Sequence, residues 1–473
     1  MDFWVGGYVQ DLLIIISLLA VAAGLRRVIR PLQTLGMPDA LIAGLIGVVL
    51  GPAVAGLLPF SAAHLEVVIY HALALVFIAV GLQAPPPGTR TGTARSIAFA
   101  IPVIATVQAI VGIGCVLAWN ATRGGPELHT GFGVMLPLGF NQGPGPAMTF
   151  GAAWERQAGM RDGAQIGLIM AALGYTWCCV VGVVLVAWGR HRGWDRAEGE
   201  TAVAAASMPA LAAQLAAQSA ETDAQQQRAP ARRAKHGGLE PLTAQLVAIA
   251  LVYLATWVFL ELMTPLLPAQ HQPTLWGFHF LIATGFALML RPLAARLPGG
   301  SPLDNDLLAR TSSTIVDLAT CAALAAVSVS VLGQHLAPVL VISTVGGLAT
   351  LFACVWMARR AFPSRPFEHA IVTYGSLTGT ATTGLALLRM LDPQLEGPAA
   401  RNYVLAVPLS ALLALPLLIV IQIPVSEFPA DYPGTALTVL GMLVGYAAIL
   451  LLAWRFMAPL RFGETPWKLW PSD

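Results

Sequence analysis

The chain has 473 residues, of which 56% are hydrophobic and only 11% are charged. A soluble domain is about 25% charged, so this composition excludes an ordinary soluble protein and indicates one that crosses a membrane many times. The formal net charge of +2 indicates no preferred partner, and no basic patch of the kind that binds nucleic acid is present in the sequence.

The first apolar run, residues 12–25, has no basic residue before it, whereas Arg26, Arg27 and Arg30 follow it. A signal peptide has the opposite arrangement, with its positive charges in front of the apolar run. The sequence therefore predicts a first membrane helix that is retained, with the N-terminus outside and the basic end in the cytoplasm.

Apolar stretches of the length that spans a bilayer, about 20 residues, continue along the chain in two sets. The first set is 5–25, 38–58, 64–83, 96–119 and 164–188, the second is 241–262, 273–290, 311–332, 337–357 and 401–422, and one further span follows at 436–457.

Between the fourth and fifth spans of each set lies a segment interrupted by glycine, proline and hydroxyl residues, about 130–153 and about 369–391. An unpaired backbone group in lipid costs several kcal/mol, so broken helices at membrane depth persist only where they are buried in protein or line a polar cavity. Two such segments at corresponding places in two halves point to the binding site of a transporter. In the first segment Pro144 and Pro146, alternating with Gly143 and Gly145, predict an extended turn.

The two halves align at an offset of 236 residues, which pairs Pro102 with Pro338 and Gly143 with Gly379. If each broken segment returns to its own side of the membrane, all of the 26 lysines and arginines except Arg123, Arg156 and Arg161 lie on the cytoplasmic side. Basic residues favour the cytoplasm, so both segments are predicted to be re-entrant hairpins.

These observations predict an all-α polytopic membrane protein made of two inverted repeats. Each repeat has five transmembrane helices, an odd number, so the two repeats have opposite orientations. The predicted divisions are an N-terminal repeat at 1–189, a cytoplasmic linker at 190–238, a C-terminal repeat at 239–424, and an additional helix and tail at 425–473, with the C-terminus in the cytoplasm.

The re-entrant segments offer helix N-termini, close approach at glycines, and side-chain amides and hydroxyls, which together suit a small anion. Unwound carbonyls and hydroxyls also suit Na⁺. We expect the substrate to bind at Asn141, Gln142, Gly143, Gly145, Thr378, Gly379, Thr380, Thr383 and Arg389, and the coupling ion at Ser376, Thr382 and Asp317.

Each of these expectations has a structural alternative. The hydroxyls can bond back to their own helix or pack between helices. Arg389 can clamp a carboxylate, or it can extend to the membrane surface or pair with Asp392. Asp317 can bind a cation or carry a proton, or it can be an interfacial residue near the start of its helix, because the predicted span begins only six residues before it.

No cofactor or resident metal is expected, because the five cysteines lie in apolar spans without ligand spacing. An enzyme is not expected either. The sequence has no HExxH motif, no second buried aspartate to pair with Asp317, and no acidic pair for Mg²⁺.

At these residues the chain resembles the sodium/glutamate symporter family and, in plan, the carriers of 2-hydroxycarboxylates. Residues 375–393 resemble the second-loop signature of that family, whereas the first loop, Gly-Gly-x-Gly in the family, here reads Asn-Gln-Gly-Pro-Gly at 141–145. The resemblance implies sodium-coupled symport of glutamate or a related small carboxylate by alternating access, in the bacterial cytoplasmic (inner) membrane and as a homodimer. We expect the altered first loop to determine substrate selectivity.

Two alternatives within this plan remain open. One is a proton-coupled carrier or an exporter, with Asp317 as the proton carrier. The other is a transporter-like membrane sensor whose output runs through residues 190–238, a segment too short for a folded signalling domain.

Overall fold

A computed structural model describes residues 7–29, 32, 37–84, 92–195, 239–268, 272–296, 301–392, 395, 397–426, 428–458 and 469–470. Within these residues all regular structure is helical, and nine helices are long and apolar enough to cross a membrane. This is the pattern of a multi-pass membrane protein. Most of the predicted linker, residues 196–238, lies outside the described residues.

In chain order the first half contains α1 (Tyr8–Val28), α3 (Asp39–Leu50), α4 (Ala62–Leu82), α5 (Gly92–Arg123), α6 (Gly131–Pro137), the π-helix η1 (Leu138–Gln142), α7 (Pro144–Gln157), α8 (Gly163–Thr176), the π-helix η2 (Trp177–Gly182) and α9 (Val183–His191). The second half contains α11 (Pro241–Met263), the short 3₁₀-helix η3 (Thr264–Leu266), α12 (Gln272–Gly277), α13 (His279–Ala294), α14 (Asn305–Ala325), α15 (Val329–Gln334), α16 (Leu336–Ala361), α17 (Pro366–Leu377), α18 (Ala381–Leu388), α19 (Pro398–Val420), α20 (Ile423–Ser426) and α21 (Gly434–Met457).

Two of the predicted spans are shorter than the sequence suggested. The span predicted at 38–58 is the 12-residue helix α3, which stops at Gly51 because Pro52 follows and cannot continue the helix. The span predicted at 273–290 is divided between α12 and the 16-residue α13, with the break after Gly277. The prediction of one full-length helix was therefore wrong at both places. The two places correspond, since each is the second predicted span of its half.

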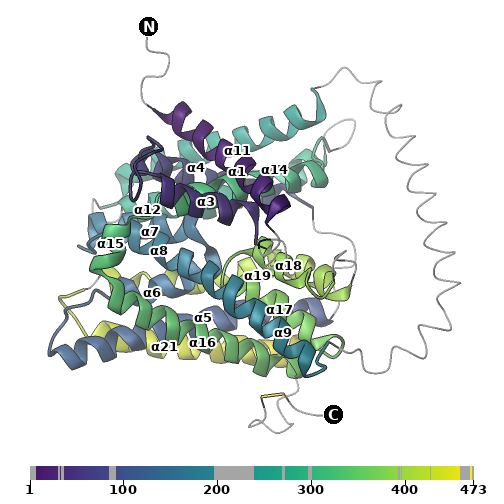
Figure 1. The fold of residues 1–473 in the computed structure, drawn as a ribbon. Helices are drawn as coiled ribbons and strands as arrows, with labels where there is room; N and C mark the ends of the chain where they lie inside the picture. The colour runs from purple at the N-terminus through teal and green to yellow at the C-terminus, as the bar shows by residue number, and fades with distance from the viewer. Residues whose placement is uncertain are drawn as a thin grey trace, which may run out of the picture.

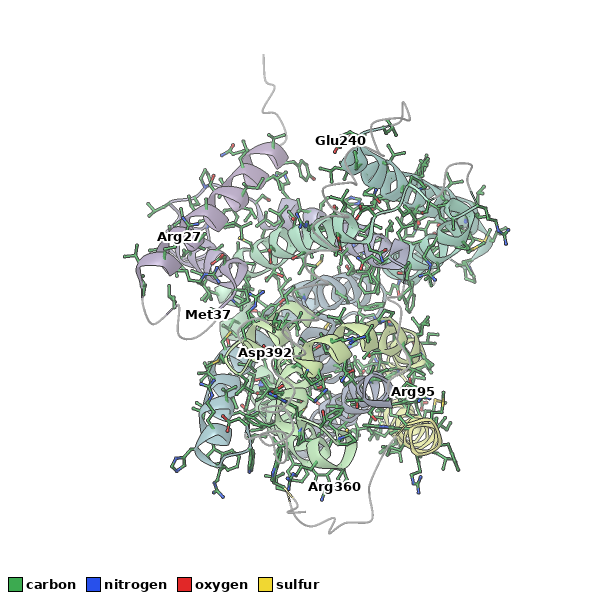
Figure 2. All side chains as sticks on the ribbon, turned by 90° about the vertical axis from the view of Figure 1, so that its right-hand side faces the viewer. Arg27, Met37, Arg95, Glu240, Arg360 and Asp392 are labelled. Carbon is green, nitrogen blue, oxygen red and sulfur yellow. The ribbon has the colours of Figure 1, made fainter. Side chains whose placement is uncertain are left out.

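The helices form two layers, which separate in both views of the molecule (Figures 1 and 2). One layer, which we call the six-helix layer, holds α1, α3, α4, α11, α13 and α14. The other, the broken-helix layer, holds α5 to α9, α16 to α19 and α21. The layers touch mainly where α4 and α14 meet α7 and α8, and Figure 2 labels Met37 at this boundary.

Several helix pairs pack in the same way in the two halves. Helix α3 packs on α14, and α13, the equivalent of α3 in chain order, packs on α4. Likewise α1 packs on α3 as α11 packs on α13, and α5 packs on α6 as α16 packs on α17. The equivalents α4 and α14 pack on each other, and so do α5 and α16. Exchanging the two halves leaves this set of contacts unchanged.

The last long helix, α21, packs against α5 in the broken-helix layer. Trp454 is fully buried there, and its indole N–H donates to the Ser96 hydroxyl over 3.1 Å. The other face of α21 exposes large apolar side chains such as Leu452 and Phe456. Helix α11 also exposes large apolar side chains, among them Leu254 and Trp257. Apolar faces of this extent are compatible with lipid rather than with water.

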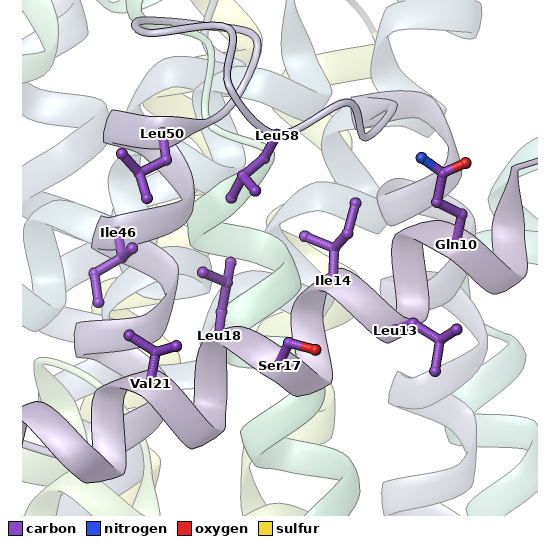
Figure 3. A pocket seen from close by; sticks show the side chains of 9 residues that line it. All are labelled: Gln10, Leu13, Ile14, Ser17, Leu18, Val21, Ile46, Leu50 and Leu58. Atoms are coloured by element: carbon purple, nitrogen blue, oxygen red, sulfur yellow. The ribbon is translucent and has the colours of Figure 1, made fainter.

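A groove of about 390 Å³ lies between α1 and α3 on the six-helix layer (Figure 3). Seven of its nine lining residues are apolar, and the other two are Gln10 and Ser17. None of the predicted site residues lies in it. A surface of this composition suits hydrocarbon and offers little to a small polar ligand.

Candidate functional site

The first broken segment is helical almost throughout and breaks at one residue. Helix α6 continues into η1, and the chain then turns at Gly143 before α7 begins. Gly143 has φ 80° and ψ −172°, a region that is essentially restricted to glycine. The extended turn predicted at Pro144 and Pro146 is wrong. Both prolines lie in the first turn of α7, where a missing N–H costs nothing.

The second broken segment breaks over three residues, Thr378, Gly379 and Thr380, between α17 and α18. The two helices pack side by side. A Cβ atom built on Gly375 of α17 would stand only 2.8 Å from the Cα atom of Gly384 in α18. Glycine at these positions therefore lets the segment fold back on itself.

The two breaks meet inside the protein, although they belong to different halves of the chain. A Cβ atom built on Gly143 would stand 3.2 Å from the Thr380 methyl carbon, 3.9 Å from the Gly379 carbonyl oxygen and 3.8 Å from the Tyr175 hydroxyl oxygen. The Tyr175 ring, from α8, also lies 3.0 Å from the place of a Cβ on Gly379. We call the contact of Gly143, Gly379, Thr380 and Tyr175 the tip junction.

Three of the predicted hydroxyls are buried and bonded within the protein. Ser376 lies 2.7 Å from the Tyr403 hydroxyl of α19, and Thr378 donates to the Tyr374 carbonyl over 2.8 Å. Thr383 accepts the backbone N–H of Thr380 over 2.8 Å, and its hydroxyl lies 2.9 Å from the Gly375 carbonyl oxygen. These bonds match the structural alternative and hold the second break in shape.

Other predicted side chains remain partly accessible around the tip junction. Asn141 and Gln142 end η1, and Thr380 and Thr382 begin α18, with all four half-buried. The hydroxyls of Thr380 and Thr382 lie 2.8 Å apart. Two amides and two hydroxyls therefore stand where a ligand would reach the helix breaks.

Two helix N-termini also converge on the tip junction, those of α7 and α18. Each carries the positive end of a helix dipole and backbone N–H groups without helical partners. In α7 the prolines remove two of these donors, so Gly145, which is half-buried, supplies the remaining early N–H. The electrostatics favour an anion at this point.

Arg389 lies apart from the tip junction. It caps the C-terminal end of α18 and is exposed. At a rise of about 1.5 Å per residue, the eight residues of α18 place it about 12 Å from the break. Asp392, its suggested partner, accepts the backbone N–H of Gly397 over 2.8 Å.

Asp317 lies deeper in its helix than the sequence indicated. Helix α14 begins at Asn305 rather than at 311, so Asp317 is twelve residues from its start and half-buried. The predicted position near a helix start is wrong, because the polar first turns of α14 had been left out of the apolar span. Asp317 also precedes Thr320 by three residues, which places the two on one face.

Two residues of the site were not predicted from the sequence, Tyr175 and Gln108. Tyr175 lies in an apolar span with no motif around it, so nothing marked it. Gln108 is fully buried in α5, and its amide donates to the Thr350 hydroxyl over 3.0 Å and to the Leu377 carbonyl, at the end of α17, over 2.8 Å. A glutamine in the middle of an apolar span was a visible signal for it.

Among the described residues no three histidine, cysteine or acidic side chains are grouped to hold a metal ion. The oxygen atoms near the breaks are carbonyls, hydroxyls and amides, which are hard ligands of the kind that Na⁺ takes. Comparisons with protein-family models, curated proteins and solved structures find no match for this chain.

Proposed function

We propose that the protein is a secondary active transporter that carries a small carboxylate together with Na⁺. The observation that carries this proposal is the tip junction, where two helix breaks from different halves of one membrane protein meet. Broken helices that meet inside the protein are the means by which many transporters build a site at the centre of the bilayer.

The chemistry of the tip junction supports an anionic substrate. Two helix N-termini point their dipoles at it, and the amides of Asn141 and Gln142 and the hydroxyls of Thr380 and Thr382 stand around it. Carboxylate oxygens accept such hydrogen bonds, and the hydroxyl and carbonyl oxygens suit a sodium ion.

The two halves are, in this proposal, inverted repeats with re-entrant hairpins at 130–153 and 369–391. Two independent observations support it. The contacts among α1, α3, α4 and the start of the first broken-helix region recur among α11, α13, α14 and their counterparts, as a two-fold relation between the halves requires. The re-entrant arrangement also leaves only Arg123, Arg156 and Arg161 of the basic residues on the outside.

The proposed family is that of the sodium/glutamate symporters, in a bacterial cytoplasmic membrane and as a homodimer. The second loop, residues 375–393, supports it through its sequence. The first loop carries amides at 141 and 142 where the family has glycines. The carboxylate that binds can therefore differ from glutamate, and glutamate is tested as one of a panel of carboxylates.

Alternating access would arise from movement of the broken-helix layer against the six-helix layer. The tip junction belongs to the broken-helix layer. Helix α14 of the six-helix layer lies against it near Thr320. A shift at this boundary would expose the junction to one side of the membrane at a time.

A proton-coupled carrier is the second candidate, and the position of Asp317 favours it. This carboxylate lies in the middle of a membrane helix and forms no ion pair among the described residues. An intramembrane carboxylate of this kind is a common proton carrier. An exporter driven in the same way belongs to this candidate.

The test is uptake by the purified protein in liposomes, with a panel of labelled amino, hydroxy and dicarboxylic acids. We expect uptake of at least one carboxylate under an inward Na⁺ gradient, and none when K⁺ replaces Na⁺ or in protein-free liposomes. Uptake that persists without Na⁺ and collapses with a protonophore would favour proton coupling. If no carboxylate is taken up under either gradient, the proposed function is wrong.

A further inference from the structure

The Tyr175 hydroxyl is a polar group that the packing of the protein does not satisfy. Tyr175 is 3% exposed, and its hydroxyl oxygen is buried without a hydrogen-bond partner among the described residues. A buried hydroxyl left unsatisfied is unfavourable, so native proteins rarely keep one that has no use.

The surroundings of this hydroxyl come from both layers. It faces the hydroxyls of Thr380, in the broken-helix layer, and Thr320, on α14 of the six-helix layer, without completing a bond to either. The Tyr175 ring is held by Leu41 of α3 and Leu324 of α14. The hydroxyl is thus fixed in direction, beside the N-terminus of α18 and at the boundary between the layers.

The glycines of the tip junction let the backbone of both breaks pass close to Tyr175. A Cβ atom on Gly143 would stand 3.8 Å from the Tyr175 hydroxyl oxygen. A Cβ atom on Gly379 would stand 3.0 Å from the Tyr175 ring. A phenolic hydroxyl donates well, and its neighbours here are two other hydroxyls and the positive end of a helix dipole. A negatively charged oxygen is the acceptor that fits all of them.

We propose that Tyr175 is a substrate-binding residue, whose hydroxyl donates to a carboxylate of the transported molecule at the tip junction. This inference rests on the proposed function and adds a donor from α8 to the two loops. Thr320 stands beside the same hydroxyl, so in this proposal the six-helix layer contributes to the site when the layers are in contact.

The experiment measures binding directly, as the shift in melting temperature of the purified full-length protein on titration with each carboxylate of the panel, with and without Na⁺. Tyr175→Phe keeps the ring and its packing, so its melting temperature without ligand should stay close to that of the wild type. Its affinity for the bound carboxylate should fall at least about tenfold, the effect of losing a hydrogen bond to a charged group. Thr320→Val should weaken binding in the same direction.

Tyr446→Phe is the matched control. Tyr446 lies on α21 and donates to the Leu413 carbonyl, away from the tip junction, so binding should stay within about twofold of the wild type. If Tyr175→Phe binds with wild-type affinity, the proposal is overturned, whatever the transport assay gives. If the wild type binds only compounds without a carboxylate, or none of the panel, both the role of Tyr175 and the carboxylate function are overturned. Binding lost in Tyr175→Phe, in a protein that shows no uptake, would support the site and contradict only transport.

Discussion

At the scale of single residues, threonines in one loop serve different purposes. Thr383 is 3% exposed and ties together Gly375 and Thr380, the two sides of the second break. Thr382, one residue earlier, is half-buried, and among the described residues its hydroxyl contacts the Thr380 hydroxyl alone. Neighbouring residues in a short loop thus separate into one that shapes the backbone and one that is free to meet a ligand.

Substitution of these two threonines by valine should separate the roles. Thr383→Val keeps the shape of the side chain but leaves the Thr380 N–H and the Gly375 carbonyl without their partner, so it should lower the free energy of unfolding by about 1–3 kcal/mol. Thr382→Val should change that free energy by less than about 0.5 kcal/mol and weaken carboxylate binding. Denaturation in detergent, followed by circular dichroism, measures the first effect. An equal loss of stability in both variants would contradict the assignment.

At the scale of elements, the sequence predicted where the helices break but not how. Clusters of glycine with proline, amide or hydroxyl residues located both breaks, because such residues are dense in an apolar segment only at these two places. The clusters did not reveal that Gly143 alone leaves helical geometry in the first segment. The prolines beside it suggested a longer break, but proline is acceptable in the first turn of a helix. Which threonines face inward depended on the fold of α17 against α18, and Tyr175 was invisible because its importance comes entirely from contacts distant in sequence.

The conformation of Gly143 gives a prediction at this scale. In Gly143→Ala the new methyl group would require a strained backbone at φ 80° and would stand 3.2 Å from the Thr380 methyl group. We expect a loss of about 1–3 kcal/mol in the free energy of unfolding and a larger loss of carboxylate binding.

Gly114→Ala provides the control for that variant. Gly114 lies in α5, where a Cβ atom would meet nothing within 4 Å, so alanine should be neutral or slightly stabilising. Thermal unfolding and ligand titration of both proteins measure the difference. A Gly143→Ala protein that melts and binds as the wild type does would show that the break needs no glycine.

At the scale of the whole molecule, one histidine joins three connections outside the long helices. His129 follows α5, accepts the backbone N–H of Gly131 over 3.0 Å and donates to the Ala158 carbonyl, beyond α7, over 3.0 Å. Its ring also lies 4.5 Å from that of Phe428, in the connection before α21. Both ring nitrogens are satisfied only in the neutral form, because Nδ1 must accept.

Burial lowers the pKa of His129 to about 4, whereas an unfolded histidine titrates near about 6.5. Between these values the unfolded chain binds a proton that the folded protein does not, so the free energy of unfolding should fall as the pH is lowered from about 6.5 towards about 4. In His129→Gln this part of the pH dependence should disappear. Melting temperatures measured across that range test it, and an unchanged pH profile in the variant would assign the effect to other groups.

Direct backbone contacts decide which parts of this molecule can shear. A Cβ atom on Gly112 of α5 would stand 2.0 Å from the Gly133 carbonyl oxygen of α6, and one on Gly151 of α7 would stand 2.1 Å from the Gly163 carbonyl oxygen of α8. Main chains this close cannot slide, since any step along the axis would drive a side chain into the neighbouring backbone. The boundary between the layers, where Leu41 and Leu324 meet Tyr175, is instead made of side-chain ends. If the two layers move as proposed, the first broken segment should travel as one rigid piece with α5 and α8, and the plane of slip should pass beside the Tyr175 hydroxyl.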